Sequence, residues 1–464
     1  MRPSPLAPLL LLGWLAAALP GCGSDRGPVA PPAPPPVQPA DPERLLSDAE
    51  LATPADPQAP AENAAWEAWV RANHHPVRSV TATRDFSDLQ FLKPLLAGRR
   101  VVQLGESGHG VREFNQAKVR LIRFLHQEMG FEVIAFESGL YECWQADRSV
   151  GSAAPRDVMR SCIFGVWHTE EVLPLFDYLA ETRRGGRPLT LAGFDTQMSS
   201  RTGSVDRPAF FRDLVARVDT AYARRVHALD SAYVDTYQRG TFASFSAHVA
   251  ANQTALLAGY DTLTRFFERH GAELGRADPS RPRVGLLARQ AAWSAGEFAR
   301  QTLPGGGMLR DPGMADNITF LLREMYPDKK IIVWAHNAHI RHAGQATTYA
   351  PGNRMGTFVA ERHRAELYTV GLYMYRGTSA SNSRQTMAVT PHEAGSLESV
   401  LYRTRRKYAF VDLLGQPRSG GSEWIFQPVT AKEWGQSAYR MVPRDQYDGI
   451  LFVDSTSVPQ YLVQ

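Results

Sequence analysis

The sequence of 464 residues predicts an α/β fold, in which a mainly parallel central sheet is flanked by helices and carries a helical insertion. Short apolar runs rich in β-branched residues recur along the chain, and amphipathic helical segments separate many of them. Strands that alternate with helices in this way are typical of parallel sheets with crossover connections. One longer stretch, at about residues 205–301, has helical patterns but few strand-like runs, which indicates the insertion.

The predicted strands are short apolar segments. They cover residues 100–104, 132–136, 189–193, 330–334, 367–374, 408–413 and 449–453. The clearest crossover helix lies between the first two of them, at residues 113–129. Phe114, Ala117 and Leu121 recur there at the spacing that forms one apolar face of a helix.

The insertion, placed between the third and fourth strands, is compatible with two roles. It either roofs the cleft and supplies the apolar wall that recognises a substrate, or it buttresses the fold without touching the substrate. The sequence leaves both open.

The N-terminus has the layout of a cleaved export signal. Arg2 precedes an apolar run from Leu6 to Leu19, which is too short to span a membrane comfortably. The segment Leu19-Pro-Gly-Cys22 resembles a bacterial lipobox, so we predict a lipoprotein signal peptide at residues 1–21 and lipidation of Cys22. An ordinary signal peptide cut near the same place is the alternative.

A Pro/Ala-rich tether is predicted at residues 22–61, because runs of proline favour extended polyproline II over a packed core. Residues 62–464 then form the α/β domain. A lipid at Cys22 would anchor the protein to a membrane rather than insert it, which predicts a bacterial cell-envelope location on the periplasmic side of a membrane or at the cell surface.

Charge and cysteine content narrow the class of protein further. The formal net charge is +4, from 51 Lys and Arg against 47 Asp and Glu, which argues against nucleic acid as the main partner. Besides Cys22, the chain contains only Cys143 and Cys162. In an oxidising compartment these two either form a disulfide or stay free and buried, and their spacing does not decide between the two.

Acidic and imidazole side chains follow the predicted strands. Glu106 and His109 lie in the Gly105–Gly110 turn after the first strand, Glu137 follows the second, and His336 follows the fourth. Because the carboxyl ends of parallel strands meet at one edge of a sheet, we expect these side chains to share one cleft. The pattern favours an enzyme.

The Gly105–Gly110 turn does not match the common nucleotide or serine-hydrolase motifs. It lacks the Gly-Lys-Ser/Thr ending of a phosphate-binding loop, and His109 interrupts the Gly-x-Ser-x-Gly of a nucleophile elbow, which makes Ser107 a weak nucleophile candidate. Its glycines permit a tight turn and close approach of the backbone to a ligand. The alternative is that Glu106 and His109 only cap the following helix.

Two further carboxylates need an explanation. Glu137 ends an otherwise apolar run, so its charge requires a partner, and His109 is the expected one. Asp195 follows the third strand and is either a site residue or a helix cap.

Taken together, these residues and motifs make the chain resemble the erythromycin esterase family. The matching motifs occur in the family's order and are Gly105–Gly110, Glu113-Phe114, Phe136-Glu137, Gly193–Asp195, Arg310-Asp311, Met314-Ala315, Asn317, Ala335–Asn337 and His339. The resemblance implies an α/β core with a helical insertion, and hydrolysis of a macrolide lactone by an activated water without a metal or other cofactor. In it His109 is the general base, and Glu106, Glu137 and His336 line the same pocket. Lys118 departs from the arginine common in the family, which puts the role of that position in doubt.

The residues support this chemistry. An imidazole can take a proton from water while a neighbouring carboxylate fixes its tautomer. Attack on a small-molecule ester then creates an oxyanion that needs donors. The candidates for oxyanion support or substrate binding, besides His336, are Arg112, Asp195, Arg310, Asn337 and His339.

Two other functions remain compatible with the same residues. One is a metal-dependent hydrolase, because Glu106, His109, Glu137, His336 and His339 are all competent ligands for zinc, although no His-Glu-x-x-His helix is present. The other is a non-catalytic envelope protein that uses the pocket to bind a ligand.

Overall fold

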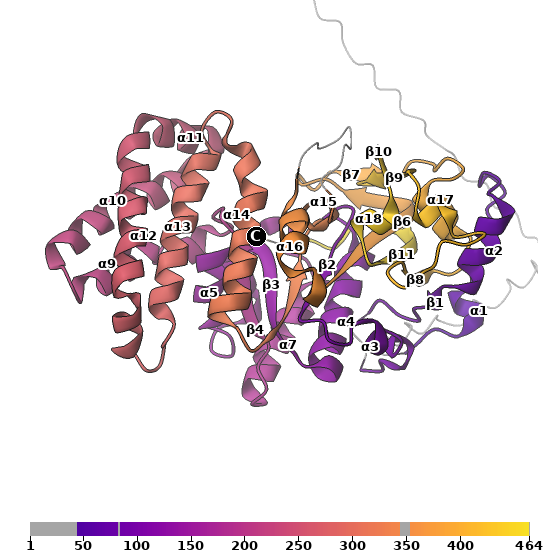
Figure 1. Ribbon diagram of the computed structural model, residues 1–464, viewed down its shortest axis with the longest axis horizontal. Coiled ribbons are helices and arrows are strands. Elements are labelled where there is room, and N and C mark those ends of the chain that lie inside the picture. Colours follow the sequence, from indigo (N-terminus) through magenta and orange to yellow (C-terminus); the bar gives the residue numbers. More distant parts are fainter. Residues whose placement is uncertain (1–43, 82–83, 344–352, 464) are drawn as a thin grey trace, which may run out of the picture. The chain divides into compact units, whose positions relative to one another are not determined.

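The central sheet joins nine strands of the described residues in the order β1-β8-β11-β6-β2-β5-β3-β4, and β7 pairs with β6 (Figure 1). The computed structural model describes residues 44–463 except 82–83 and 344–352. The strands are β1 (His75–Pro76), β2 (Val101–Leu104), β3 (Phe131–Gly139), β4 (Thr190–Asp195), β5 (Lys330–Trp334), β6 (Leu367–Ala380), β7 (Thr386–Ala388), β8 (Tyr408–Asp412) and β11 (Gly449–Thr456). The strands from β11 to β4 are all parallel to their neighbours, whereas the pairs β1-β8, β8-β11 and β6-β7 are antiparallel. This sheet, with its flanking helices, confirms the predicted fold class.

Helices connect most of the strands. Outside the insertion, the α-helices of the described residues are α1 (Asp48–Leu51), α2 (Ala64–Ala72), α3 (Leu92–Leu95), α4 (Arg112–Met129), α5 (Leu140–Asp147), α6 (Pro155–Cys162), α7 (Leu173–Arg184), α8 (Arg201–Ser204), α14 (Arg310–Phe320), α15 (Asn337–Ile340), α16 (Met355–His363), α17 (Leu397–Tyr402) and α18 (Pro443–Gln446). The crossover helix expected at residues 113–129 is α4, which ends at Gly130 in the left-handed conformation that glycine adopts readily.

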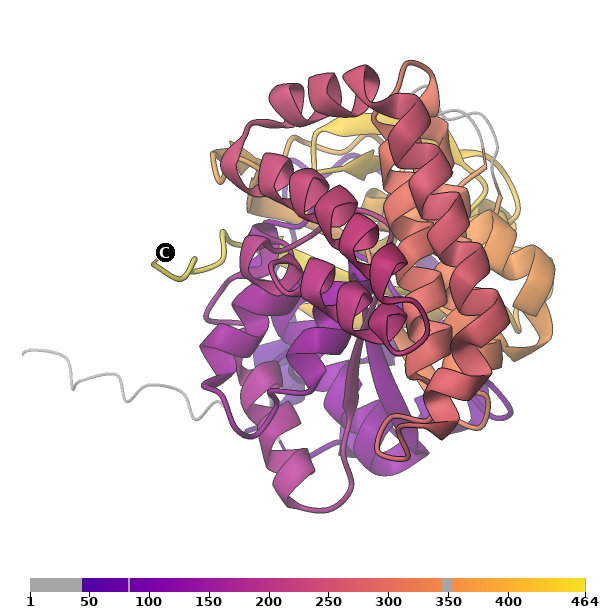
Figure 2. The ribbon, with the colours of Figure 1, turned by 90° about the vertical axis from the view of Figure 1, so that its left-hand side faces the viewer.

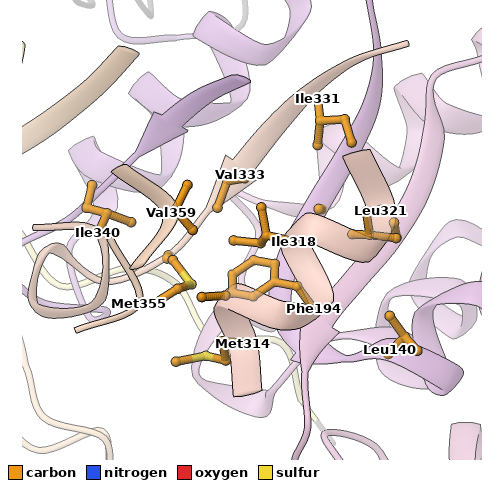
Figure 3. Packing of buried hydrophobic residues seen from close by; sticks show 14 of the residues in the cluster. Leu140, Phe194, Met314, Ile318, Leu321, Ile331, Val333, Ile340, Met355 and Val359 are labelled. Atoms are coloured by element: carbon orange, nitrogen blue, oxygen red, sulfur yellow. The ribbon is translucent and has the colours of Figure 1, made fainter. Parts of the chain in front are cut away.

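Both faces of the central strands are buried, which is why these strands read as continuous apolar runs. Val101 of β2 belongs to one core cluster and the next residue, Val102, to the other. On the first face, Met314 and Ile318 of α14 share a cluster with Phe194 of β4 and Val333 of β5 (Figure 3). The core therefore fixes α14, and with it Arg310 at its first turn, against the strand ends.

The helical insertion is present between β4 and β5. It comprises α9 (Arg207–Ala216), α10 (Thr220–Arg239), α11 (Phe242–Ala251), α12 (Gln253–Arg276) and α13 (Val284–Gln301). Its helices lie beside one another next to α5 and the β4 end of the sheet (Figures 1 and 2). A buried ion pair between Arg207 and Asp230, with the Tyr260 hydroxyl donating to the same carboxylate, joins α9, α10 and α12.

The folded unit begins before residue 62, where we expected the tether to end. Ser47 caps α1 through a reciprocal capping box with Glu50, and Leu51 is fully buried. Thr53 then donates a backbone hydrogen bond to Arg405. A proline-rich composition thus hid a short segment whose apolar residue enters the core. The predicted signal peptide and Cys22 lie outside the described residues.

Two features of the fold were open or unforeseen. Cys143 of α5 and Cys162 of α6 form a disulfide. A second sheet, the hairpin of β9 (Val429–Glu433) and β10 (Ser437–Met441), was not predicted. The inward positions of β9 include the carboxylate Glu433, which interrupts the alternation of apolar and polar residues that marks a half-buried strand. In the part of the chain that the structure describes, no helix is both long and apolar enough to cross a membrane.

Candidate active site

Glu106 and His109 form the centre of the site, in the turn that follows β2. Backbone hydrogen bonds from Gly105 and Ser107 to β6 hold the turn in place. Nδ1 of His109 lies 2.6 Å from Oε1 of Glu106. Because Glu106 accepts this bond, Nδ1 carries the proton and Nε2 of His109 is left with a lone pair.

Glu106 is buried and bonded on both oxygens. The indole N–H of Trp167 donates to Oε1 at 2.8 Å, and Nζ of Lys118 lies 2.8 Å from Oε2. Burial favours the neutral acid, but Lys118 and His109 outweigh it and lower the pKa of Glu106. Burial in turn lowers the pKa of Lys118 to about 8, against the attraction of Glu106. Lys118 therefore has a definite role, as the counter-charge of Glu106.

Glu137 pairs with Arg310, not with His109 as we expected. Nη2 of Arg310 donates to Oε1 of Glu137 at 2.9 Å and to Oδ2 of Asp195 at 2.5 Å. Oε2 of Glu137 accepts the backbone N–H of His336 at 2.9 Å. Burial opposes ionisation of Glu137, but His339 and Arg310 lower its pKa overall. The planar guanidinium of Arg310 thus pairs with two carboxylates at once, one at β3 and one at β4.

Asp195 is not the cap of the following helix α8, whose N-cap is Ser200. Asp195 accepts from Arg310, and its Oδ1 also accepts the backbone N–H of Gln197, as in a capped turn. His339 lies beside this group, with Nδ1 2.7 Å from Oδ1 of Asp311 and Nε2 3.4 Å from Glu137. Burial disfavours its charge, but Asp311 and Glu137 outweigh burial and raise the pKa of His339.

His336 packs directly against His109, with ring centroids 4.9 Å apart. The His336 ring also stacks on Trp434, with centroids 5.5 Å apart. Nδ1 of His336 accepts the backbone N–H of Ala338 at 3.1 Å, so the neutral ring carries its proton on Nε2. Burial, assisted by the neighbouring histidines, holds the pKa of His336 well below its ordinary value. His336 is therefore a neutral ring behind the base.

A cavity of about 520 Å³ opens at these strand ends. His109, Glu137 and Arg310 face it, and its walls come from residues 164–167 and 382–384. No residue of the helical insertion is among the lining residues that the structure describes. The apolar wall that we considered for the insertion is supplied instead by Phe164, Val166 and Trp167.

Comparison with known proteins identifies the family of this chain. A sequence model of the erythromycin esterase family matches residues 126–456. The chain belongs to the erythromycin esterase family. It is 31% identical to "Putative hydrolase YbfO" of Bacillus subtilis (strain 168), over 86% of this chain and 93% of that protein. It is 23% identical to the erythromycin esterase type II of Escherichia coli, over 68% of this chain and 78% of the relative.

Solved structures agree on the fold. A mutant of the erythromycin esterase EreC in its open conformation superposes with a TM-score of 0.64 at 20% identity. The match covers 82% of this chain and 96% of EreC. Family membership suggests a hydrolase.

Two residues that we expected in the site of this erythromycin esterase relative lie elsewhere. Arg112 is partly exposed and its Nε lies 3.1 Å from Glu171, away from the cavity. Asn337 is fully buried and exchanges hydrogen bonds with the backbone of Leu372. A Cβ at Gly105 would lie 2.0 Å from Oδ1 of Asn337, so this pair fixes the turn and leaves Asn337 no access to a substrate.

The sequence did not indicate three neighbours of the site. Trp167 and Trp434 both contact the His109 ring, at centroid distances of 4.9 Å and 5.3 Å, and Glu433 lies behind His336. None follows a strand of the parallel sheet, so the rule that located the other residues did not apply to them.

The described residues contain no group of three or more His, Cys, Asp or Glu side chains arranged to hold a metal ion. The carboxylates that were candidate ligands are instead bonded to cations: Glu106 to Lys118, and Glu137 to Arg310. The donor set therefore does not fit a metal as it stands.

Proposed function

We propose that this protein is a carboxylic ester hydrolase in which His109 activates a water molecule, without a metal ion. The observation that carries the proposal is the pairing of His109, which lines the cavity, with the buried, charged Glu106. Glu106 fixes the proton on Nδ1 and leaves Nε2 of His109 to act as base.

In the proposed reaction, Nε2 of His109 takes a proton from water as the water oxygen attacks the ester carbonyl carbon. The carbonyl oxygen becomes an oxyanion. The tetrahedral intermediate collapses by breaking the bond to the alkoxy oxygen, which takes the proton back from the His109 imidazolium. Glu106 remains a carboxylate throughout and stabilises the imidazolium.

Arg310 is the proposed donor to the oxyanion. Its guanidinium faces the cavity and is held in place by Glu137 and Asp195. Burial opposes its charge, but these two carboxylates raise the pKa of Arg310, so it stays cationic. A preorganised cation beside the forming oxyanion needs no rearrangement during the reaction.

The substrate we propose is a lactone or another carboxylic ester. Two relatives carry the name erythromycin esterase, which makes a macrolide lactone the first substrate to test.

The test is incubation of the purified protein with erythromycin and a panel of simple carboxylic esters, followed by mass spectrometry. The proposal expects a mass gain of one water for at least one substrate, and no gain with His109→Asn. Activity that disappears on dialysis against a chelator and returns with added zinc would establish the metal-dependent alternative. Ligand binding without turnover across the panel would support a binding protein.

We also propose that Cys22 anchors the mature protein in the cell envelope through a lipid. Wild-type protein should then fractionate with membranes after cell lysis, and Cys22→Ser should be released to the soluble fraction. Equal distribution of the two forms would contradict the anchor.

A further inference from the structure

The turn of the β9-β10 hairpin contacts the turn that follows β2. The backbone N–H of Trp434 donates to the carbonyl of Ser107 at 2.5 Å, and the hydroxyl of Ser379 donates to the carbonyl of Trp434. Trp434 has a φ of 59°, a conformation rare for a bulky residue. A Cβ at Gly108 would lie only 3.0 Å from the Trp434 ring, so the turn and the hairpin are closely fitted.

Glu433, the last residue of β9, is brought by this turn to His336. Its Oε2 lies 3.5 Å from Nε2 of His336, and both side chains are buried. Neither oxygen of Glu433, nor Nε2 of His336, has a hydrogen-bond partner of good geometry in the described part of the chain. Since Nδ1 of His336 accepts from Ala338, the proton is on Nε2, the ring nitrogen that lies 3.5 Å from the Glu433 carboxylate.

The environment of Glu433 does little to stabilise its charge. Burial, only partly offset by Arg341 and the Tyr439 hydroxyl, raises the pKa of Glu433 to about 7. The other titratable groups near it are His339, Tyr373, Glu398 and Tyr447. A buried carboxylate of this kind costs stability whenever it is ionised, unlike the well-bonded Glu106.

We propose that Glu433 is a positioning residue for the catalytic pair of His109 and Glu106. It accepts a hydrogen bond from the Nε2–H of His336 and so fixes the neutral ring against which His109 packs. This inference rests on the proposed hydrolase function. Two imidazoles in contact do not readily carry a charge each, because like charges repel. Because this hydrogen bond keeps His336 as the neutral Nε2–H tautomer, His109 is free to become the imidazolium during turnover.

The test compares Glu433→Gln with Glu142→Gln. Glu142 of α5 is also fully buried, its pKa is also raised to about 7, chiefly by burial, and it does not line the cavity. In both cases the unfolded chain ionises at a lower pH than the folded one, so above pH 7 the folded state holds a costly charge that glutamine removes. Both variants should therefore melt about 2 °C higher than wild type at pH 8.5, and at the same temperature as wild type at pH 5.

The two variants should differ in catalysis. Glu433→Gln should lower kcat about 10-fold to 100-fold with KM changed less than about twofold, because the substrate does not touch it. Glu433→Asp, which keeps the charge, should recover part of the loss. Glu142→Gln should keep the wild-type kcat. A Glu433→Gln protein with wild-type kcat would overturn the inference.

Nuclear magnetic resonance of ¹⁵N-labelled histidine gives a measurement that needs no turnover. His336 should be a neutral Nε2–H tautomer in wild type and in Glu142→Gln, and its Nε2 signal should shift in Glu433→Gln. An unchanged His336 signal would overturn the inference by itself. If wild type hydrolyses no ester, the proposed function fails, while this measurement still decides the role of Glu433.

Discussion

Two buried glutamates face two histidines in this protein, in opposite environments. Glu106, at the end of β2, is bonded to Lys118, Trp167 and His109, and these neighbours lower its pKa. Glu433, at the end of β9, has no comparable donors, and burial raises its pKa to about 7. A glutamate beside a histidine can therefore supply a permanent charge, as Glu106 does, or a hydrogen-bond acceptor that orients the ring, as we propose for Glu433. The donors that surround the carboxylate determine which of the two it does.

Removal of the base should give the largest effect. His109→Asn should lower kcat/KM about 1000-fold, because asparagine can keep a bond to Glu106 but cannot take the proton from water. The measurement is steady-state hydrolysis of the best ester in the panel. A melting temperature close to wild type serves as the control for folding. Loss of less than tenfold would show that another group acts as the base.

Removal of Lys118, the counter-charge of Glu106, should have the second-largest effect on turnover. Lys118→Met removes the cation beside buried Glu106, which should lower the free energy of unfolding by about 4 kcal/mol. Turnover should fall about 100-fold, since Glu106 then becomes neutral and no longer stabilises the His109 imidazolium. Chemical denaturation and kinetics measure the two effects. An unchanged unfolding free energy would remove the contrast between Glu106 and Glu433.

The pH dependence sharpens the same contrast. Below about pH 8 Lys118 is charged and supports Glu106, and above it the lysine becomes neutral. We expect kcat/KM to fall about tenfold per pH unit above pH 8, after correction for spontaneous hydrolysis. Lys118→Arg keeps its charge at these pH values and should lose this alkaline limb. If the fall of kcat/KM above pH 8 persists in Lys118→Arg, another group causes it.

Trp434, in the turn of the β9-β10 hairpin, should have a smaller effect on kcat. Trp434→Ala removes the ring stacked on His336 and in contact with His109, and an aromatic contact contributes about 1 kcal/mol. We therefore expect kcat to fall about fivefold to tenfold. Kinetic assay of Trp434→Phe, which keeps a ring, is the matched control and should lie closer to wild type.

Arg112 should have the smallest effect. Its ion pair with Glu171 joins a partly exposed side chain to a largely buried one and lies away from the cavity. Arg112→Ala should change kcat/KM less than about twofold in the same assay. A tenfold loss would mean that Arg112 reaches the substrate, contrary to its position here.

Much of the site was predictable because it follows one rule. Glu106, His109 and His336 follow parallel strands, and Glu137 lies near the carboxyl end of β3. Parallel strands bring their carboxyl ends to one edge of the sheet. Which of them bond to each other was not predictable. Glu137 bonds to Arg310 because α14 enters at that edge, and α14 is positioned by core contacts such as Ile318 with Val333.

The sequence by itself determined the α/β class, the helical insertion, the family and the set of groups at the strand ends. These follow from short-range patterns of apolar and polar residues and from motifs within single segments. Only the tertiary structure decided the environment of each group: which glutamate pairs with Lys118, which lies beside His336, and which loops line the cavity. Burial and the donors that surround a carboxylate come from segments far apart in the chain, and no local pattern encodes their meeting.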